Sequence, residues 1–277
     1  MHRLVPTLMI MLAATAASAE DIDYCERGLR AQRAGDDDMA NADYDRCLNG
    51  NPRPSFYRPM VLFNRGGARI AKGQYDGAIA DLDAAIKEMP GVTLVYNLRG
   101  AAYDGMGDYD RAIADYDTAI RLEPDDAAAL TGRGIVHEHQ RQYDGAIADF
   151  DAALKQRQTD YTALVHRGLA YGHQGRFDSA FADLNFAIEL RPSGADAFIS
   201  RGHVYDLKGD FTRAIADYDA AITLLPGQPG SAAEAWFGRG IAYSRIGKRD
   251  LAERDFRRAA ALDPGIEAKV NKIGLVR

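Results

Sequence analysis

The histidines are the side chains of this chain best suited to acid–base or metal chemistry. His139 and His173 lie 34 residues apart, and the carboxylates of Glu138 and Asp104 share the position before theirs in the repeat described below. Such groups could hold zinc or activate a water molecule. However, a metal requires ligand atoms about 2 Å from one centre, whereas neighbouring helix axes lie about 8–10 Å apart. The spacing therefore predicts no metal site, and a histidine-dependent metal-binding or hydrolytic protein stays as an alternative.

Other arrangements that carry catalysis do not emerge from the sequence. The stretch Gly105-Met106-Gly107 precedes a predicted helix but follows no strand, so it does not match a phosphate-binding loop. Serine and cysteine are not arranged with a histidine base as a catalytic nucleophile requires. We therefore expect no enzymatic activity and no cofactor.

The composition is that of a folded protein with little affinity for polyanions. The 277 residues are 47% hydrophobic and 27% charged, and the formal net charge is −6. A net negative charge disfavours binding to phosphate backbones. The sequence therefore predicts no nucleic-acid partner.

Residues 1–19 have the pattern of a secretory signal peptide. A cationic start at His2 and Arg3 precedes an apolar run over residues 4–14, and small residues end the segment at Ala19. The apolar run is shorter than the roughly 20 residues needed to cross a bilayer. We expect cleavage after Ala19, export of the protein and no membrane span.

The rest of the chain repeats with a period of 34 residues. An offset of 34 aligns five glycines, and two steps of 38 add one glycine at each end. The aligned set is Gly28, Gly66, Gly100, Gly134, Gly168, Gly202 and Gly240. These glycines occupy position 8 of seven repeats that start at residues 21, 59, 93, 127, 161, 195 and 233.

Each repeat has the pattern of two helices joined by a turn. In the third repeat, Tyr96, Gly100 and Tyr103 share one face of a helix predicted over residues 94–105. Asp110, at position 18, is predicted to cap the second helix, and Pro124 ends it. Small residues at positions 8 and 20 let the two helices approach closely.

The repeat resembles the tetratricopeptide repeat. The residues that carry the resemblance in the third repeat are Tyr96, Gly100, Tyr103, Gly107, Tyr109, Ala112, Tyr116, Ala119 and Pro124. The resemblance covers residues 21–266 and implies an all-α fold, a right-handed α-solenoid of seven helix-turn-helix repeats. It implies that the first helices line a concave groove for a peptide or helix of a partner. The Ala-, Arg- and Asp-rich repeats are similar to secreted bacterial members, which implies a periplasmic location, with the extracellular space as the alternative.

The repeats give a plan of the chain. The signal peptide at 1–19 is followed by a first repeat with a cysteine pair at 20–54 and a linker at 55–58. The three prolines near that linker lie within residues 51–59, on either side of 55–58. Repeats two to six occupy 59–228, an insertion 229–232 and the seventh repeat 233–266. Residues 267–277 are predicted to form a terminal helix that covers the last repeat.

An arginine and an aspartate recur in all seven repeats. Position 7 is Arg and position 23 is Asp throughout, from Arg27 and Asp43 to Arg239 and Asp255. In an antiparallel helix pair these positions lie within about one turn of each other. We predict a ladder of Arg–Asp pairs with a packing role, and a charged docking stripe is the alternative.

The first repeat carries the chain's two cysteines. Cys47 occupies position 27, where the other six repeats have Ala, and Cys25 occupies position 5. An exported protein can be oxidised, so a Cys25–Cys47 disulfide is predicted, with two thiols as the alternative.

Positions 5, 9, 12 and 13 of the first helices are expected to face the groove of the resembled fold. The predicted partner-binding residues are Phe63, Asn97, Asp104, Thr131, Ile135, Glu138, His139, Val165, Leu169, His173, Ile199, His203 and Asp206. A mainly apolar set with an acidic edge suits an apolar or amphipathic segment with some positive charge.

The sequence thus predicts a non-enzymatic scaffold of the bacterial cell envelope that binds a protein or peptide partner. A chaperone-like module that holds exported polypeptides is the alternative, and self-association of the chain is a further option. The two classes differ in their ligands, because a scaffold binds one partner whereas a chaperone binds many unfolded chains weakly.

Overall fold

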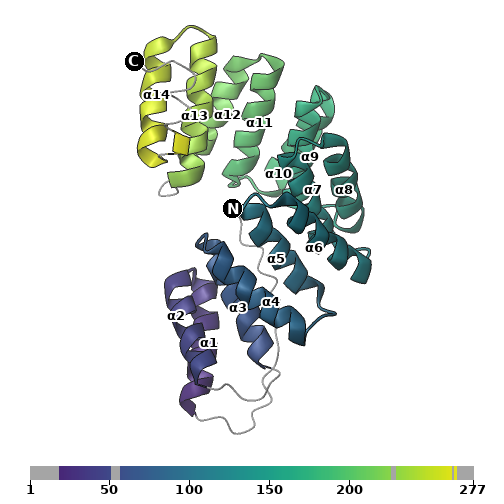
Figure 1. Cartoon of the computed structure of the whole chain (residues 1–277). Coiled ribbons are helices and arrows are strands. Elements are labelled where there is room, and N and C mark those ends of the chain that lie inside the picture. The colour runs from purple at the N-terminus through teal and green to yellow at the C-terminus, as the bar shows by residue number, and fades with distance from the viewer. Residues whose placement is uncertain (1–18, 51–56, 226–228, 264, 267–277) are drawn as a thin grey trace. The chain divides into compact units, whose positions relative to one another are not determined.

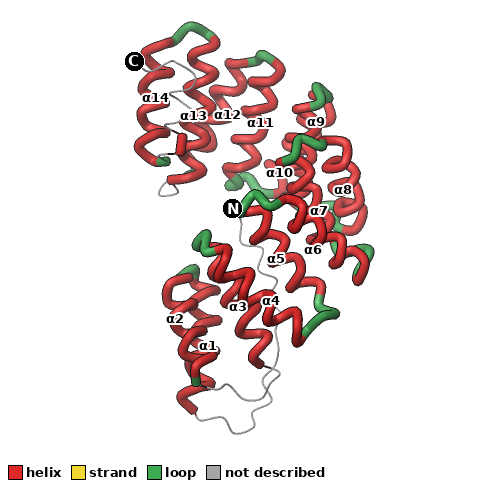
Figure 2. Tube along the Cα trace, in the orientation of Figure 1, coloured by secondary structure: helices red, strands yellow, loops and turns green. Residues whose placement is uncertain are grey.

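Helices account for all the regular structure in the part of the chain that is described. The computed structural model describes residues 19–50, 57–225, 229–263 and 265–266. These residues form fourteen helices and no strand, and Figure 2 shows helix and turn alternating along the chain. The predicted all-α solenoid of helix-turn-helix repeats is therefore confirmed.

Each repeat contributes two consecutive helices, which are labelled in Figure 1. The first four repeats contain α1 (Ala19–Ala34), α2 (Asp37–Asn49), α3 (Tyr57–Ala71), α4 (Tyr75–Glu88), α5 (Thr93–Gly105), α6 (Tyr109–Leu122), α7 (Ala127–His139) and α8 (Tyr143–Gln156). The last three contain α9 (Tyr161–His173), α10 (Phe177–Leu190), α11 (Ala195–Lys208), α12 (Phe211–Leu224), α13 (Pro229–Arg245) and α14 (Arg249–Leu262).

The chain divides into two compact bodies, residues 1–136 and 137–277, with the boundary inside α7. We call them the N-terminal body and the C-terminal body. Within each body, first helices of successive repeats contact one another, as α3 contacts α5 and α9 contacts α11. Each second helix also contacts the first helix of the next repeat, as α4 contacts α5 and α10 contacts α11. The core of each body therefore lies between a layer of first helices and a layer of second helices.

The helix pairs interlock through the glycine at position 8. A Cβ atom on Gly100 would lie 3.0 Å from the ring of Tyr116, and one on Gly168 would lie 2.7 Å from Leu184. Both neighbours occupy position 24, where every repeat has Tyr, Leu or Phe. The alanines at position 20 are buried beside them. Close packing thus explains why the same two positions carry small residues in every repeat.

A substitution at Gly240, the position-8 glycine of the last repeat, tests this packing. A Cβ atom there would lie 2.7 Å from the ring of Phe256, which is buried. We expect Gly240→Ala to lower the free energy of unfolding by about 1–3 kcal/mol because the ring cannot give way. At Gly145 the nearest atom to such a Cβ is 3.4 Å away, so Gly145→Ala should be neutral or stabilising through helix propensity. Urea unfolding that ranks the two variants in the opposite order would refute the interlock.

The second helices begin two residues earlier than the predicted cap. The side chains of Asp36, Asp108 and Asp210, at position 16, accept hydrogen bonds from the backbone amide three residues later. Asp110 lies inside the first turn of α6, so its assignment as the N-cap was wrong. A carboxylate in the first turn still interacts favourably with the helix dipole, which accounts for the recurrence of Asp at position 18.

The turn between the two helices requires a left-handed backbone conformation. Six repeats place Gly at position 15, with φ between 69° at Gly73 and 85° at Gly35. The fourth repeat has Arg141 there, with φ 60°, and no other described non-glycine residue has a positive φ. A side chain in this conformation is strained, so position 141 departs from the rule that the other turns follow.

Several predicted segments differ from the observed helices or lie partly outside the described residues. Helix α3 begins at Tyr57, inside the predicted linker, and α13 begins at Pro229, so the insertion at 229–232 extends a helix. Most of the predicted signal peptide and the whole predicted terminal helix at 267–277 lie outside the described residues. Ile266, just before that segment, is buried against the last repeat. Within the described ranges, no helix has the length and apolarity required to span a membrane.

Candidate functional site

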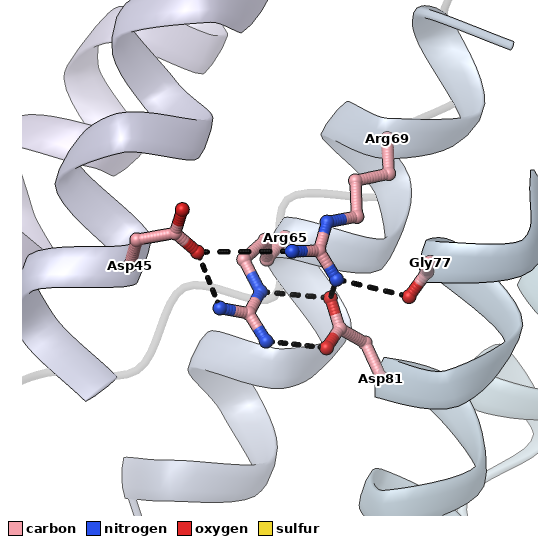
Figure 3. Close-up of polar contacts among 5 residues, drawn as sticks. All are labelled: Asp45, Arg65, Arg69, Gly77 and Asp81. Carbon is pink, nitrogen blue, oxygen red and sulfur yellow. Dashed lines mark hydrogen bonds and ion pairs between the residues drawn. The ribbon is translucent and has the colours of Figure 1, made fainter. Parts of the chain in front are cut away.

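The recurrent arginines and aspartates form bidentate pairs between the two helices of a repeat. In the third repeat, Arg99 donates to both carboxylate oxygens of Asp115 at 2.8 and 2.6 Å. Figure 3 shows the equivalent pair, Arg65 with Asp81. The described pairs are Arg27–Asp43, Arg65–Asp81, Arg99–Asp115, Arg167–Asp183, Arg201–Asp217 and Arg239–Asp255. The Arg133–Asp149 pair remains a prediction, because Arg133 belongs to the N-terminal body and Asp149 to the C-terminal body.

From the second repeat on, each arginine also reaches the second helix of the preceding repeat. Arg65 donates to Asp45 at 2.5 Å, as Figure 3 shows, and Arg99 donates to Asp83 at 2.5 Å. The later contacts join Arg133 to Asp117, Arg167 to Asp151, Arg201 to Asn185 and Arg239 to Asp219. One guanidinium therefore ties three helices together, and the ladder joins repeats as well as helices.

The sequence carries a signal for this second contact. Position 25, the acceptor, is Asp in five repeats and Asn185 in another. The last repeat has Arg257 there, which donates to Glu253 within α14. The aspartates at position 23 are buried, and Arg27 holds the pKa of Asp43 below its usual value through a direct hydrogen bond. The stripe is thus used for packing rather than exposed for docking.

The cysteines of the first repeat join its two helices. Cys25 on α1 and Cys47 on α2 form a disulfide, with Cα atoms 5.2 Å apart. Cys47 is buried in the cluster that also contains Ala40 and Tyr44. The predicted pairing therefore agrees with the geometry of the helix pair.

The predicted binding residues of the N-terminal body are largely used for packing. Phe63 and Thr131 are buried, while Asp104 and Ile135 are half-buried. The amide of Asn97 donates to Asp126 at 2.9 Å. Phe63 packs with Leu62, Leu82 and Val95, so it belongs to the core rather than to a surface.

In the C-terminal body, the predicted residues divide into a buried and an accessible group. Val165 is only 4% exposed and belongs to the core. Leu169, Ile199 and His203 are half-buried, and His139 and His173 are exposed. The accessible group lies on α9 and α11, which contact each other, and on the end of α7. We call the accessible sides of α9, α11 and α13 the first-helix face.

Two acidic residues of this body contact neighbouring side chains, and the acidic edge stays a prediction. Glu138 and the Nδ1 atom of His166 lie 2.8 Å apart, and Tyr218 donates to Asp206 at 2.9 Å. A similar contact joins Tyr44 to Gln32 in the first repeat, at 2.8 Å. In the first and sixth repeats, a tyrosine at position 24 thus donates to a polar acceptor at position 12. In the fourth repeat position 24 is Phe150, and Glu138 at position 12 contacts a histidine instead.

A row of rings crosses the C-terminal body near the ends of its first helices. His173 stacks on Tyr143 with ring centroids 4.9 Å apart and contacts His203 at 5.3 Å. Desolvation lowers the pKa of His203, and the neighbouring His173 acts in the same direction. Desolvation also lowers the pKa of His173. No group of three potential ligands that could hold a metal occurs among the described residues.

The pH dependence of stability tests the position of Asp206. Burial raises the pKa of this carboxyl to about 6, above its value in an unfolded chain. Its ionisation therefore costs stability, and the cost appears as the pH rises from about 4 to 7. We expect Asp206→Asn, which can still accept from Tyr218, to melt above the wild type at pH 7.5 and level with it at pH 4.5. If the thermal midpoints of the variant and the wild type differ by the same amount at both pH values, the raised pKa of Asp206 is contradicted.

The fold and these contacts define a class of protein: a helical repeat array whose recurrent charged residues hold the helices together. Profiles of the tetratricopeptide repeat match residues 97–161, 165–229 and 233–266, which together exceed half of the chain. The chain belongs to the tetratricopeptide repeat family. Proteins with this fold are typically protein–protein interaction scaffolds.

Solved structures with the same fold come from several bacteria. A tetratricopeptide repeat protein from Parabacteroides merdae superposes with a TM-score of 0.72 at 20% identity, over 90% of this chain and 96% of that chain. PilW, described as a widely conserved type IV pilus biogenesis factor, gives 0.64 at 20% identity, over 74% and 94%. A thermophilic repeat protein of Thermus thermophilus gives 0.57 at 22% identity, over 66% and 98%. At these identities the likeness shows the fold alone.

The comparison with curated proteins adds no closer relative. No curated protein sequence matches the chain. The functional argument therefore starts from the surface of the molecule itself.

Proposed function

We propose that this protein is a non-enzymatic scaffold of the bacterial cell envelope that binds a segment of a partner protein along the first-helix face of the C-terminal body. The partner segment is an extended peptide or a helix with apolar side chains. The chain supplies a rigid array, and the partner supplies the segment that lies across its first helices.

The observation that carries this proposal is the set of apolar side chains left accessible on neighbouring first helices. Leu169 on α9, Ile199 on α11 and Ile241 on α13 are half-buried, although they lie on packed helices. The arginines of the same helices are used in the ladder, and Glu138 and Asp206 are hydrogen-bonded internally. The chemistry left to this face is therefore mainly apolar contact.

The envelope location is supported by two features of the chain. Residues 1–19 have the composition of a signal peptide, and the Cys25–Cys47 disulfide suits an oxidising compartment. Expression of the full chain in a bacterial host tests the location. N-terminal sequencing of the exported protein should begin at Glu20, and an uncleaved protein in the cytoplasm would refute it.

The binding role is tested by polar substitution on the first-helix face. Leu169→Ser combined with Ile199→Ser should remove most of the partner that co-purifies from the envelope fraction, because the apolar contact is lost. The matched control is Phe186→Ser with Leu190→Ser, since both residues are exposed on the second helix α10.

Circular dichroism at the assay temperature establishes that both variants are folded. One partner that is lost in the first variant and kept in the control supports the scaffold. Equal capture by both variants contradicts the proposal, and weak capture of many exported chains indicates a chaperone-like holder instead.

A further inference from the structure

We propose that the ends of the first helices in the C-terminal body bind an acidic segment of the partner that also carries a large apolar side chain. This surface, the turn edge, consists of the turns between paired helices in that body, and the side chains that carry the argument are Arg141, His173, Leu207, Arg245 and Ile246. The inference rests on the proposed function, because it names the chemistry of the partner's segment.

The turn edge is continuous across the successive helices. The His173 ring contacts His203 on α11, and the amide of Gln174 donates to Asp144 on the neighbouring turn at 2.7 Å. Arg141 is near enough to His173 for its charge to help lower the pKa of that ring, after desolvation and against Glu138. The charge of Arg245 on α13 acts in the same way on Asp206 of α11.

Exposed cations without carboxylate partners gather at this edge. The exposed cations of this edge are Arg141, Arg176, Lys208, Arg245, Lys248 and Arg249. Within the described part of the chain none of them forms an ion pair, whereas each recurrent arginine of the ladder does. The whole chain has a net charge of −6, so a cationic edge is a local departure from the average. Three exposed carboxylates lie there as well, at Asp144, Asp178 and Asp250, each in the first turn of a second helix.

Large apolar side chains stand between the cations. Leu207 is 42% exposed and Ile246 is 39% exposed, and each is adjacent in sequence to a cation of the edge. A pocket of about 260 Å³ lies at the first of these turns, lined by Arg141, Gln142, Tyr143, Asp144, Gly145 and Gln174. Side-chain amides and a guanidinium around a pocket suit hydrogen bonds to a carboxylate of the partner.

Charge complementarity therefore selects an acidic occupant rather than a basic one. Glu138 and Asp206 are half-buried and contact His166 and Tyr218 within the body, so they are not among the exposed charges of the turn edge. A segment with carboxylates flanking a leucine-sized residue would pair its charges with Arg141 and Arg245 and cover Leu207. The isolated apolar side chains favour a peptide over a lipid surface, which calls for a broad apolar face.

A binding assay on the full exported chain tests this inference. The probe is a fluorescent peptide in which pairs of glutamates flank leucines, and the reference probe has lysine in place of each glutamate. We expect the acidic peptide to bind at least tenfold more tightly, and its affinity to fall as sodium chloride is raised. Equal or tighter binding of the lysine peptide overturns the inference.

The variant Arg141→Gly with Arg245→Ala isolates the two cations. It should weaken the acidic peptide about tenfold, while the thermal midpoint stays level or rises, because Gly relieves the left-handed position at 141. The matched control is Arg157→Ala with Arg258→Ala, which removes two exposed cations elsewhere on the same body. Equal weakening in both variants overturns the specific edge.

Vesicles that contain anionic phospholipid serve as the competing probe. Binding to such vesicles with no binding of the acidic peptide overturns the inference in favour of a membrane surface. This failure is distinct from failure of the scaffold, because capture of an envelope partner through Leu169 and Ile199 does not depend on the charge of the turn edge.

Discussion

Replacing Arg99 by alanine is expected to lower the free energy of unfolding by about 3 kcal/mol. The change removes both hydrogen bonds to Asp115, which is 5% exposed, and the bond to Asp83 of the preceding repeat. A carboxylate then stays in the core without its counter-charge, and its desolvation is no longer offset. Urea unfolding followed by circular dichroism measures the loss.

Two further variants separate this effect from a general loss of charge. Arg111→Ala breaks an exposed pair with Asp108 and should lower the free energy of unfolding far less than Arg99→Ala does. The double change Arg99→Met with Asp115→Leu should recover much of the stability, because no buried charge is left unpaired. If Arg99→Ala lowers the free energy of unfolding as little as Arg111→Ala does, the ladder does not hold the array together.

Removing the disulfide is expected to have the second largest effect. Cys25→Ser with Cys47→Ala should destabilise the protein by about 2–4 kcal/mol, because the bond closes a long loop in the unfolded chain. Alanine is the matched replacement at 47, since the other six repeats have it at that position. The thermal midpoint of the oxidised protein measures the effect.

Reduction supplies the control for the disulfide. In dithiothreitol the wild type and the double variant should have the same thermal midpoint, since the covalent link is then absent from both. Mass spectrometry of the unreduced protein that finds two free thiols, or equal midpoints without reductant, would contradict the bond.

The fold was predictable because its signals recur. A glycine at position 8, an alanine at position 20 and a proline near the end of the second helix mark every helix pair or nearly every one, so chance agreement at a single repeat is cancelled by the others. The Arg–Asp pairs followed from the same alignment, since two charges at fixed positions of an antiparallel pair must meet. The cap was misplaced because Asp110 lies in the first turn, where a carboxylate is also favourable.

The binding surface was less predictable because burial depends on neighbours in three dimensions. Val165 and Leu169 lie one helical turn apart, yet only Leu169 remains accessible. Similarly, Asp206 was expected at an acidic edge, and the structure shows that it accepts a hydrogen bond from Tyr218 of the second helix. The repeat pattern identifies helix faces, whereas the partners of a polar side chain depend on which residue fills position 24 opposite to it.

Photocrosslinking in living cells tests the central claim most directly. A photoreactive residue at Leu169 on the first-helix face should capture one dominant envelope protein, while the same residue at Phe186 on α10 should not. Mass spectrometry of the adduct identifies the partner and the segment that was touched. Identical adducts from both positions, or none from Leu169 in folded and exported protein, would contradict a scaffold that binds through its first helices.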